Sequence, residues 1–200
     1  MKKGLTKDII VAEAMALIED QGLDAFSLRE LAARLGVRAS SLYNHVANID
    51  EIYIGVGKTV MRKLRDTLVE AIKDQQGDEA VWALAEAYYH FGKENPKLYK
   101  AFIAMHNKEG EALAYDFGET LMPFYQALAV YRLSEQEVVA MHRMLRGLIH
   151  GYLMLQEAGY FSRPIIDPEA SYRLAVQSYI DGLHAASARA EGGGAHECGK

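Results

Sequence analysis

The stretch SLRELAARLGVRASSLYNHV, residues 27–46, decides the fold that this sequence predicts. Its first half has leucine or alanine at positions 28, 31, 32 and 35, which form one apolar stripe along a helix. Ser27 fits the N-cap of that helix, and Glu30 three residues later completes a capping box. Gly36 follows the stripe, where glycine often ends a helix because it adopts a left-handed backbone at little cost. These signals predict a short, well-capped helix.

A second short helix is predicted to begin near Arg38 or Ala39, after a tight turn. Leu42 and Val46 lie four residues apart, so both belong to its inner side. Small and polar side chains occupy the rest of its surface: Ser40, Ser41, Tyr43, Asn44 and His45. Two short helices joined by a glycine-containing turn, the second with polar residues outward, are typical of the helix-turn-helix DNA-binding motif. The alternative interpretation is a structural corner between helices that contacts no DNA.

The rest of the chain also predicts helices. Capping residues mark four helix starts, at Thr6, Asn48, Ser134 and Asp167, and the helices end near Gly22, Gln76, Gly159 and Arg189. Pro96 begins a predicted short helix over residues 96–106, and Pro123 is expected to kink or split a segment over residues 109–131. Because no alternating strand pattern is present, we expect an all-α fold. We assign a helix-turn-helix domain to residues 1–48, a helical effector-binding and dimerisation domain to residues 49–190, and a flexible tail to residues 191–200.

Composition and charge limit the possible classes of protein. Half of the 200 residues are apolar, which allows a substantial core without metals or disulfides. The single cysteine, Cys198, excludes an intrachain disulfide, and the apolar runs are too short to cross a bilayer, so we expect a cytoplasmic protein. The net charge is −5, although residues 1–48 carry six cationic and six acidic side chains. The net charge of this region is therefore zero, which neither supports nor opposes DNA binding.

The longer stretch SLRELAARLGVRASSLYNHVANIDEIY, residues 27–53, resembles the tetracycline-repressor (TetR) family of bacterial transcriptional regulators in residue type and spacing. The resemblance implies phosphate contacts from Ser27, Arg29, Ser41, Tyr43 and His45. It implies contacts to base edges from Arg38, Ala39, Ser40 and Asn44. The sequence departs from the family at Arg38, where many members have a serine or threonine cap, and at Ile49, where many have a phosphate-binding lysine.

A second resemblance covers the end of the chain. The stretches HRMLRGLIHGYLMLQEAGYF, residues 142–161, and DPEASYRLAVQSYIDGL, residues 167–183, resemble the C-terminal domain of a TetR subgroup with a His-Gly motif, here His150-Gly151. The predicted helix over residues 135–159 is apolar on more than one face, which indicates burial on both sides. A partner subunit is the simplest explanation for burial of the second face. Gly147 and Gly151, four residues apart, form a glycine strip where the backbone of the partner could approach closely. We therefore predict a homodimer whose interface includes Gly147, His150, Gly151, Tyr172, Val176, Tyr179 and Leu183.

The middle of the chain is rich in aromatic residues and methionine, and we name seven candidates for an effector cavity: Trp82, Tyr89, Phe102, Met105, Phe117, Tyr125 and Met144. Residues of these types are more often part of an ordinary core than of a ligand cavity. No cofactor or metal is expected, because His142 and His150 are about 80° apart around a helix, which makes a poor metal pair, and no HExxH motif occurs.

These observations predict a homodimeric DNA-binding regulator, and not an enzyme. It would be a repressor that a small apolar or aromatic effector releases from a near-palindromic operator. The main alternative is a helical sensor or adaptor that uses its helix-turn-helix for protein contacts. A more distant alternative is a helical-bundle enzyme with a cofactor between Trp82 and Tyr152.

Overall fold

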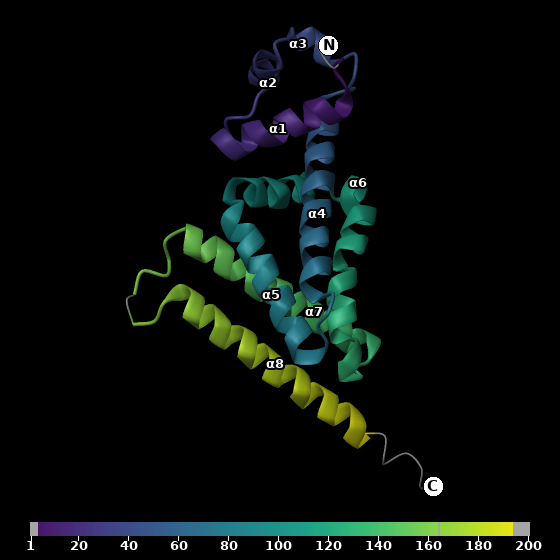
Figure 1. Cartoon of the computed structure of the whole chain (residues 1–200), viewed down its shortest axis with the longest axis vertical. Coiled ribbons are helices and arrows are strands. Elements are labelled where there is room, and N and C mark those ends of the chain that lie inside the picture. The colour runs from purple at the N-terminus through teal and green to yellow at the C-terminus, as the bar shows by residue number, and fades with distance from the viewer. Residues whose placement is uncertain (1–3, 164, 194–200) are drawn as a thin grey trace. The chain divides into compact units, whose positions relative to one another are not determined.

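The computed structural model describes residues 4–163 and 165–193, and of residues 106–118 and 190–193 only the backbone (Figure 1). No strand occurs among the described residues, which confirms the all-α prediction. The elements are, in order, α1 (Lys7–Gln21), α2 (Leu28–Leu35), α3 (Ala39–Leu42), α4 (Ile49–Ile72), α5 (Gly77–Glu94), α6 (Pro96–Leu128), a 3-10 turn (Ala129–Tyr131), α7 (Glu135–Glu157) and α8 (Pro168–Gly193).

The chain forms two compact units. One comprises Met1–Arg65 and Glu94–Thr120, and the other comprises Asp66–Lys93 and Leu121–Lys200. The first unit contains α1, α2, α3 and most of α4, together with the first part of α6. The second unit contains α5, α7 and α8, together with the ends of α4 and α6. The domain boundary that the sequence predicts after residue 48 stays a prediction.

The predicted caps are present at the ends of the helices. The Thr6 and Ser27 hydroxyls accept hydrogen bonds from the backbone N–H groups of Ile9 (3.3 Å) and Glu30 (3.2 Å). Ser134 begins α7 with a complete capping box, and the Asp167 carboxylate accepts from the first backbone N–H groups of α8. Each cap satisfies backbone donors that the helix itself leaves unpaired, which is why these four starts were predictable.

The core of the first unit joins α1 to the helices around it. The inner face of α1 consists of Ile10, Ala14, Leu17 and Ile18, which are fully buried. A close approach between α1 and α4 occurs at Gly55, where a Cβ atom would lie 2.6 Å from Val11 Cγ2. A residue larger than glycine at this position would push the two helices apart.

Buried tyrosines dominate the core of the second unit. The rings of Tyr89 and Tyr172 stack with centroids 4.2 Å apart. Their hydroxyls donate to Gln156 Oε1 (2.5 Å) and to the Ala85 carbonyl oxygen (2.7 Å), respectively. Tyr179 likewise donates to the Met141 carbonyl oxygen (3.1 Å). Since each hydroxyl has a partner, these tyrosines can be buried without leaving an unpaired polar group.

The prediction of two separate helices over residues 96–131 is wrong. A single helix, α6, runs from Pro96 to Leu128 and includes Pro123. Proline at position 123 removes one backbone donor, and it lies in a part of α6 where both it and Phe124 are buried. Packing of this kind can hold a helix together through a proline that would break it in water. None of the helices in the described residues combines the length and apolar character that crossing a membrane requires.

Candidate DNA-binding interface

A two-sided ion pair fixes α2 against α1. Arg34 donates through Nε to Glu13 Oε1 (2.6 Å) and through a terminal nitrogen to Asp20 Oδ2 (2.5 Å). These bonds, the one to Asp20 first, raise the pKa of the Arg34 guanidinium above its usual value. Arg34 therefore holds α2 against α1. Arg29 and Arg38 are exposed.

The turn between α2 and α3 uses glycine as predicted. Gly36 has φ 66° and ψ 31°, a left-handed conformation that only glycine adopts at little cost, and its N–H donates to carbonyl oxygens of the last turn of α2. Arg38 stands at the N-cap of α3 and makes no capping hydrogen bond through its side chain. The guanidinium group has no acceptor that could replace a serine or threonine hydroxyl there.

We call residues 39–46 the recognition segment. The regular helix in this segment is shorter than the sequence predicts. Four residues, Ala39–Leu42, form α3, and the chain continues through a helical turn over residues 43–45. The N–H groups of His45 (2.9 Å) and Val46 (3.1 Å) both donate to the Leu42 carbonyl oxygen. Leu42 and Val46 are buried, at 0% and 3% exposure, so the predicted inner pair anchors the segment to the core.

The predicted DNA-contacting side chains are available at the surface. Ser41 is half-buried, Tyr43 is 54% exposed, and the other seven are exposed: Ser27, Arg29, Arg38, Ala39, Ser40, Asn44 and His45. Since Leu42 and Val46 hold the segment from inside, its outer side presents hydroxyl, amide and imidazole groups together. Hydrogen-bonding groups of this kind can reach base edges and phosphates in a DNA groove.

The start of α4 is tied to the first helix. Asn48 Oδ1 accepts from the Glu51 N–H (2.9 Å), and the Glu51 carboxylate accepts from the Ala47 N–H (2.6 Å) and pairs with Lys7. The Lys7 contact, followed by the bond from Ala47, lowers the pKa of the Glu51 carboxyl. Ile49, which replaces the lysine common in the TetR family, is half-buried and begins α4. The residues around it thus serve the junction between α1 and α4.

The predicted effector residues are divided between the two compact units. Phe102 and Met105 are buried in the first unit, whereas Trp82, Tyr89, Tyr125 and Met144 belong to the second. Tyr89 is buried in the core and its hydroxyl is already hydrogen-bonded to Gln156. Met144 is 53% exposed, and the side chain of Phe117 lies outside the described residues. A cavity of about 470 Å³ lies between α1 and α4, and one of about 270 Å³ is lined by residues 69–80 and 126–127. Neither of them is lined by a predicted effector residue.

A buried histidine in the second unit was not among the predicted effector residues. His142 is 4% exposed, and its ring lies 5.2 Å from Phe124 and 5.8 Å from Tyr125, centroid to centroid. Its Nε2 atom is buried and has no hydrogen-bond partner among the described residues. Burial, with smaller effects of Arg146 and Arg143, lowers the pKa of His142 to about 4, so the ring is neutral near pH 7. The sequence offered no signal, since a histidine on an apolar helix face is usually a satisfied core residue.

The predicted dimer residues fall into two groups. Four of them are at most 1% exposed and belong to the core of the single chain: Tyr172, Val176, Tyr179 and Leu183. In contrast, a Cβ added at Gly147 or Gly151 would meet no atom of the described residues within 4 Å, and His150 is half-buried. The glycines lie on one stripe of α7 with two exposed side chains, Met144 at 53% and Leu155 at 43%.

One cluster in the second unit has residue types that bind metals. Glu86, His90 and Glu169 offer ligand atoms within 4.8 Å of one another. Arg173 contacts both carboxylates, Glu86 at 3.2 Å and Glu169 at 3.4 Å, and Lys93 contacts Glu169 at 3.1 Å. These cations already balance the carboxylate charges, so the cluster is explained as an ion-pair network that joins α5 to α8.

Comparison with protein families gives two matches on this chain. Residues 10–56 match the model described as bacterial regulatory proteins of the tetR family. Residues 81–179 match the model described as the tetracyclin repressor-like C-terminal domain. The second match extends over the aromatic middle of the chain. The His-Gly subgroup stays a prediction.

Individual relatives agree with these matches over nearly the whole length. An uncharacterized HTH-type transcriptional regulator of Bacillus subtilis (strain 168), YobS, is 30% identical over 183 residues, which cover 90% of this chain and 93% of the relative. A protein with unknown function from Rhodococcus sp. RHA1 has a similar fold, with a TM-score of 0.74 at 20% identity over 92% of this chain and 97% of that one. Apo ActR from Streptomyces coelicolor also has a similar fold, with a TM-score of 0.72 at 20% identity over 95% of this chain and 100% of that one.

Proposed function

Because this chain belongs to the tetR family of bacterial transcriptional regulators, which bind DNA and are not enzymes, we propose that it is a homodimeric repressor. It binds a near-palindromic operator and is released by a small effector. It acts in the cytoplasm, in keeping with a single cysteine at position 198 and no possible disulfide within the chain.

The observation that carries the DNA-binding role is the outer side of the recognition segment. Leu42 and Val46 are buried, while Ser40, Tyr43 and Asn44 are exposed between and beside them. We assign base readout to Arg38, Ala39, Ser40 and Asn44. We assign phosphate contacts to Ser27, Arg29, Ser41, Tyr43 and His45, which position the segment without reading sequence.

Dimerisation through α7 and α8 rests on the open glycine strip. Met144, Gly147, Gly151 and Leu155 recur along one side of α7, and Leu174 of α8 is 62% exposed. Exposed apolar side chains beside bare backbone allow the helices of a second copy to pack closely. Two copies place two recognition segments on one duplex, which is why the operator is expected to be near-palindromic.

The effector is proposed to be a small, mainly apolar or aromatic molecule that also carries a hydrogen-bonding group. The apolar part is met by aromatic side chains of the second unit, such as Trp82 and Tyr125. The polar group is met by His142 Nε2, which has no partner among the described residues. A buried polar atom without a partner is costly, so a ligand that pairs with it gains affinity and orientation.

Release requires the effector to prefer the conformation that does not bind the operator. α4 begins directly after the helix-turn-helix and continues into the second unit, so it is one of the segments that connect the two units. A hundredfold loss of operator affinity requires about 2.7 kcal/mol of differential effector affinity between the two conformations. By reciprocity, the operator weakens effector binding by the same factor.

The test is selection of bound duplexes from a random library by the full-length protein. The proposal predicts enrichment of an inverted repeat whose half-sites are about one helical turn, or a multiple of it, apart. Enrichment of a single half-site would contradict the dimer. No enrichment over several rounds at low salt would contradict the DNA-binding role and favour a helical adaptor that contacts protein.

A further inference from the structure

The groove between α1 and α4 has no part in the DNA-binding or dimer surfaces. Its volume is about 470 Å³, within the usual range of about 300–1,000 Å³ for small-molecule sites. All of the residues that line it belong to the first compact unit. In Figure 1, α2 and α3 lie on one side of α1 and the body of α4 lies on the other. None of the side chains proposed to contact DNA lines this groove.

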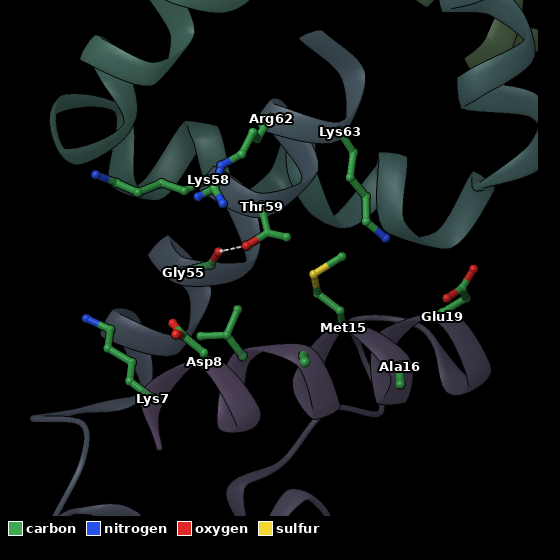
Figure 2. A pocket seen from close by; sticks show the side chains of 12 residues that line it. Lys7, Asp8, Met15, Ala16, Glu19, Gly55, Lys58, Thr59, Arg62 and Lys63 are labelled. Carbon is green, nitrogen blue, oxygen red and sulfur yellow. Dashed lines mark hydrogen bonds between the residues drawn. The ribbon is translucent and has the colours of Figure 1, made fainter. Parts of the chain in front are cut away.

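The two walls of the groove differ in chemistry. On α1, four apolar residues in the middle of the helix line it: Val11, Ala12, Met15 and Ala16. On α4, three cationic residues line it over little more than one turn: Lys58, Arg62 and Lys63. Figure 2 shows Lys63 extending from α4 toward Met15 and Glu19 of α1. An apolar wall thus faces a positively charged one across a space large enough for a ligand.

The charge of the groove is opposite to that of the protein. Four cationic and two acidic side chains line it, although the whole chain carries −5, and one of the cations, Lys7, pairs with Glu51. The acids, Asp8 and Glu19, come from the two ends of α1, outside the apolar stretch. Thr59 adds little polarity at the centre, because its hydroxyl donates to the Gly55 carbonyl oxygen (2.8 Å, Figure 2). The centre of the groove has apolar side chains on the α1 side and cationic side chains on the α4 side.

We propose that this groove binds a small anionic amphiphile, a molecule with an apolar body and one carboxylate, sulfonate or phosphate group. Its body lies against Ala12, Met15 and Ala16, and its acid group lies against Lys58 and Arg62. Charge-assisted hydrogen bonds from these cations orient it, and burial of its body supplies the rest of the affinity. The site is distinct from the proposed effector site at His142, which belongs to the other unit. A ligand here contacts α1 and α4, the helices that precede and follow the helix-turn-helix in the chain.

The test uses two dyes that differ in charge, without DNA. 8-Anilinonaphthalene-1-sulfonate is anionic, and N-phenyl-1-naphthylamine has the same aromatic body without the sulfonate. Both are titrated by fluorescence into the wild type, the double variant Lys58→Gln/Arg62→Gln, and Ala16→Phe. Arg143→Gln, at an exposed position of α7, is the control for the loss of a positive charge elsewhere. Circular dichroism of each variant shows that the helices are retained.

The wild type and Arg143→Gln are expected to bind the sulfonate equally. Its Kd should rise at least tenfold in the double variant, while the Kd of the uncharged dye changes less than twofold. Ala16→Phe, which fills the groove, should weaken both dyes. No sulfonate binding to the wild type, unchanged binding in the double variant, or unchanged binding in Ala16→Phe would each overturn the proposal. If Ala16→Phe loses its helical signal, the double variant decides the question alone.

Discussion

Gly151→Leu is expected to convert the dimer into a folded monomer and to lower operator affinity about a hundredfold or more. A Cβ at position 151 meets no atom within 4 Å in the described part of the single chain, so the leucine has room there. Leucine also favours a helix over glycine by roughly 0.8 kcal/mol, so the monomer is not destabilised. A second backbone, however, cannot approach the strip past this side chain. Without the dimer, the second half-site no longer adds to affinity, and avidity gains of this kind reach about 10²–10⁴.

Sedimentation velocity measures the oligomeric state, and a gel-shift titration with the selected operator measures affinity. Glu70→Leu is the matched control, because it adds an exposed leucine on α4, away from the strip. It should leave the dimer and the affinity unchanged. A Gly151→Leu protein that sediments as a dimer and binds the operator like the wild type would remove the glycine strip from the interface.

His142→Phe is expected to make the protein less sensitive to acid. The pKa of His142 is lowered from 6.5 to about 4 in the folded chain, chiefly by burial. The unfolded chain therefore takes up a proton below pH 6.5 that the folded chain refuses. The contribution of neutral His142 to the free energy of unfolding is fully present above pH 6.5 and is lost as the pH falls toward 4. Between pH 7.5 and 5 the loss from this residue is about 2 kcal/mol.

Urea unfolding at pH 7.5 and at pH 5 measures this difference. At pH 7.5 the variant should lie within about 1 kcal/mol of the wild type, since phenylalanine fills the site beside Phe124 without a polar atom. At pH 5 the variant should be the more stable protein. Some acid sensitivity remains, because burial and Arg146 also lower the pKa of His150. Equal losses in the two proteins would show that His142 does not titrate in this range, and its assignment as a neutral polar anchor would fail.

Local signals in the sequence were enough for most of the fold. Thr6, Ser27, Ser134 and Asp167 each cap the helix that they were expected to begin. Gly36 has the left-handed backbone that its position required. Such features depend on a few neighbouring residues, so the sequence contains all of the information that they need. The outward position of Asn44 follows in the same way from the buried pair Leu42 and Val46.

Features set by packing were not predictable in this way. Pro123 was expected to kink or split its helix, and it lies inside α6 at a buried position, where packing can outweigh the lost hydrogen bond. The tyrosines of α8 have both apolar rings and polar hydroxyls, so their spacing could not distinguish a dimer face from a core. Only the partners of Tyr172 and Tyr179 show that they are satisfied inside one chain. The unpaired Nε2 of His142, which has no partner among the described residues, depends likewise on contacts between distant residues.

The central claim is that the outer side of the recognition segment reads DNA sequence. The most direct measurement compares the affinities of wild type, Asn44→Ala and Tyr43→Phe for the selected operator and for its single-base variants. Asn44→Ala should bind the operator about 1–3 kcal/mol more weakly and lose discrimination at one position in each half-site. Tyr43→Phe should weaken all of the sequences by a similar factor, as expected for a phosphate contact. If Asn44→Ala binds the operator as tightly and as selectively as the wild type, the recognition segment has been assigned incorrectly.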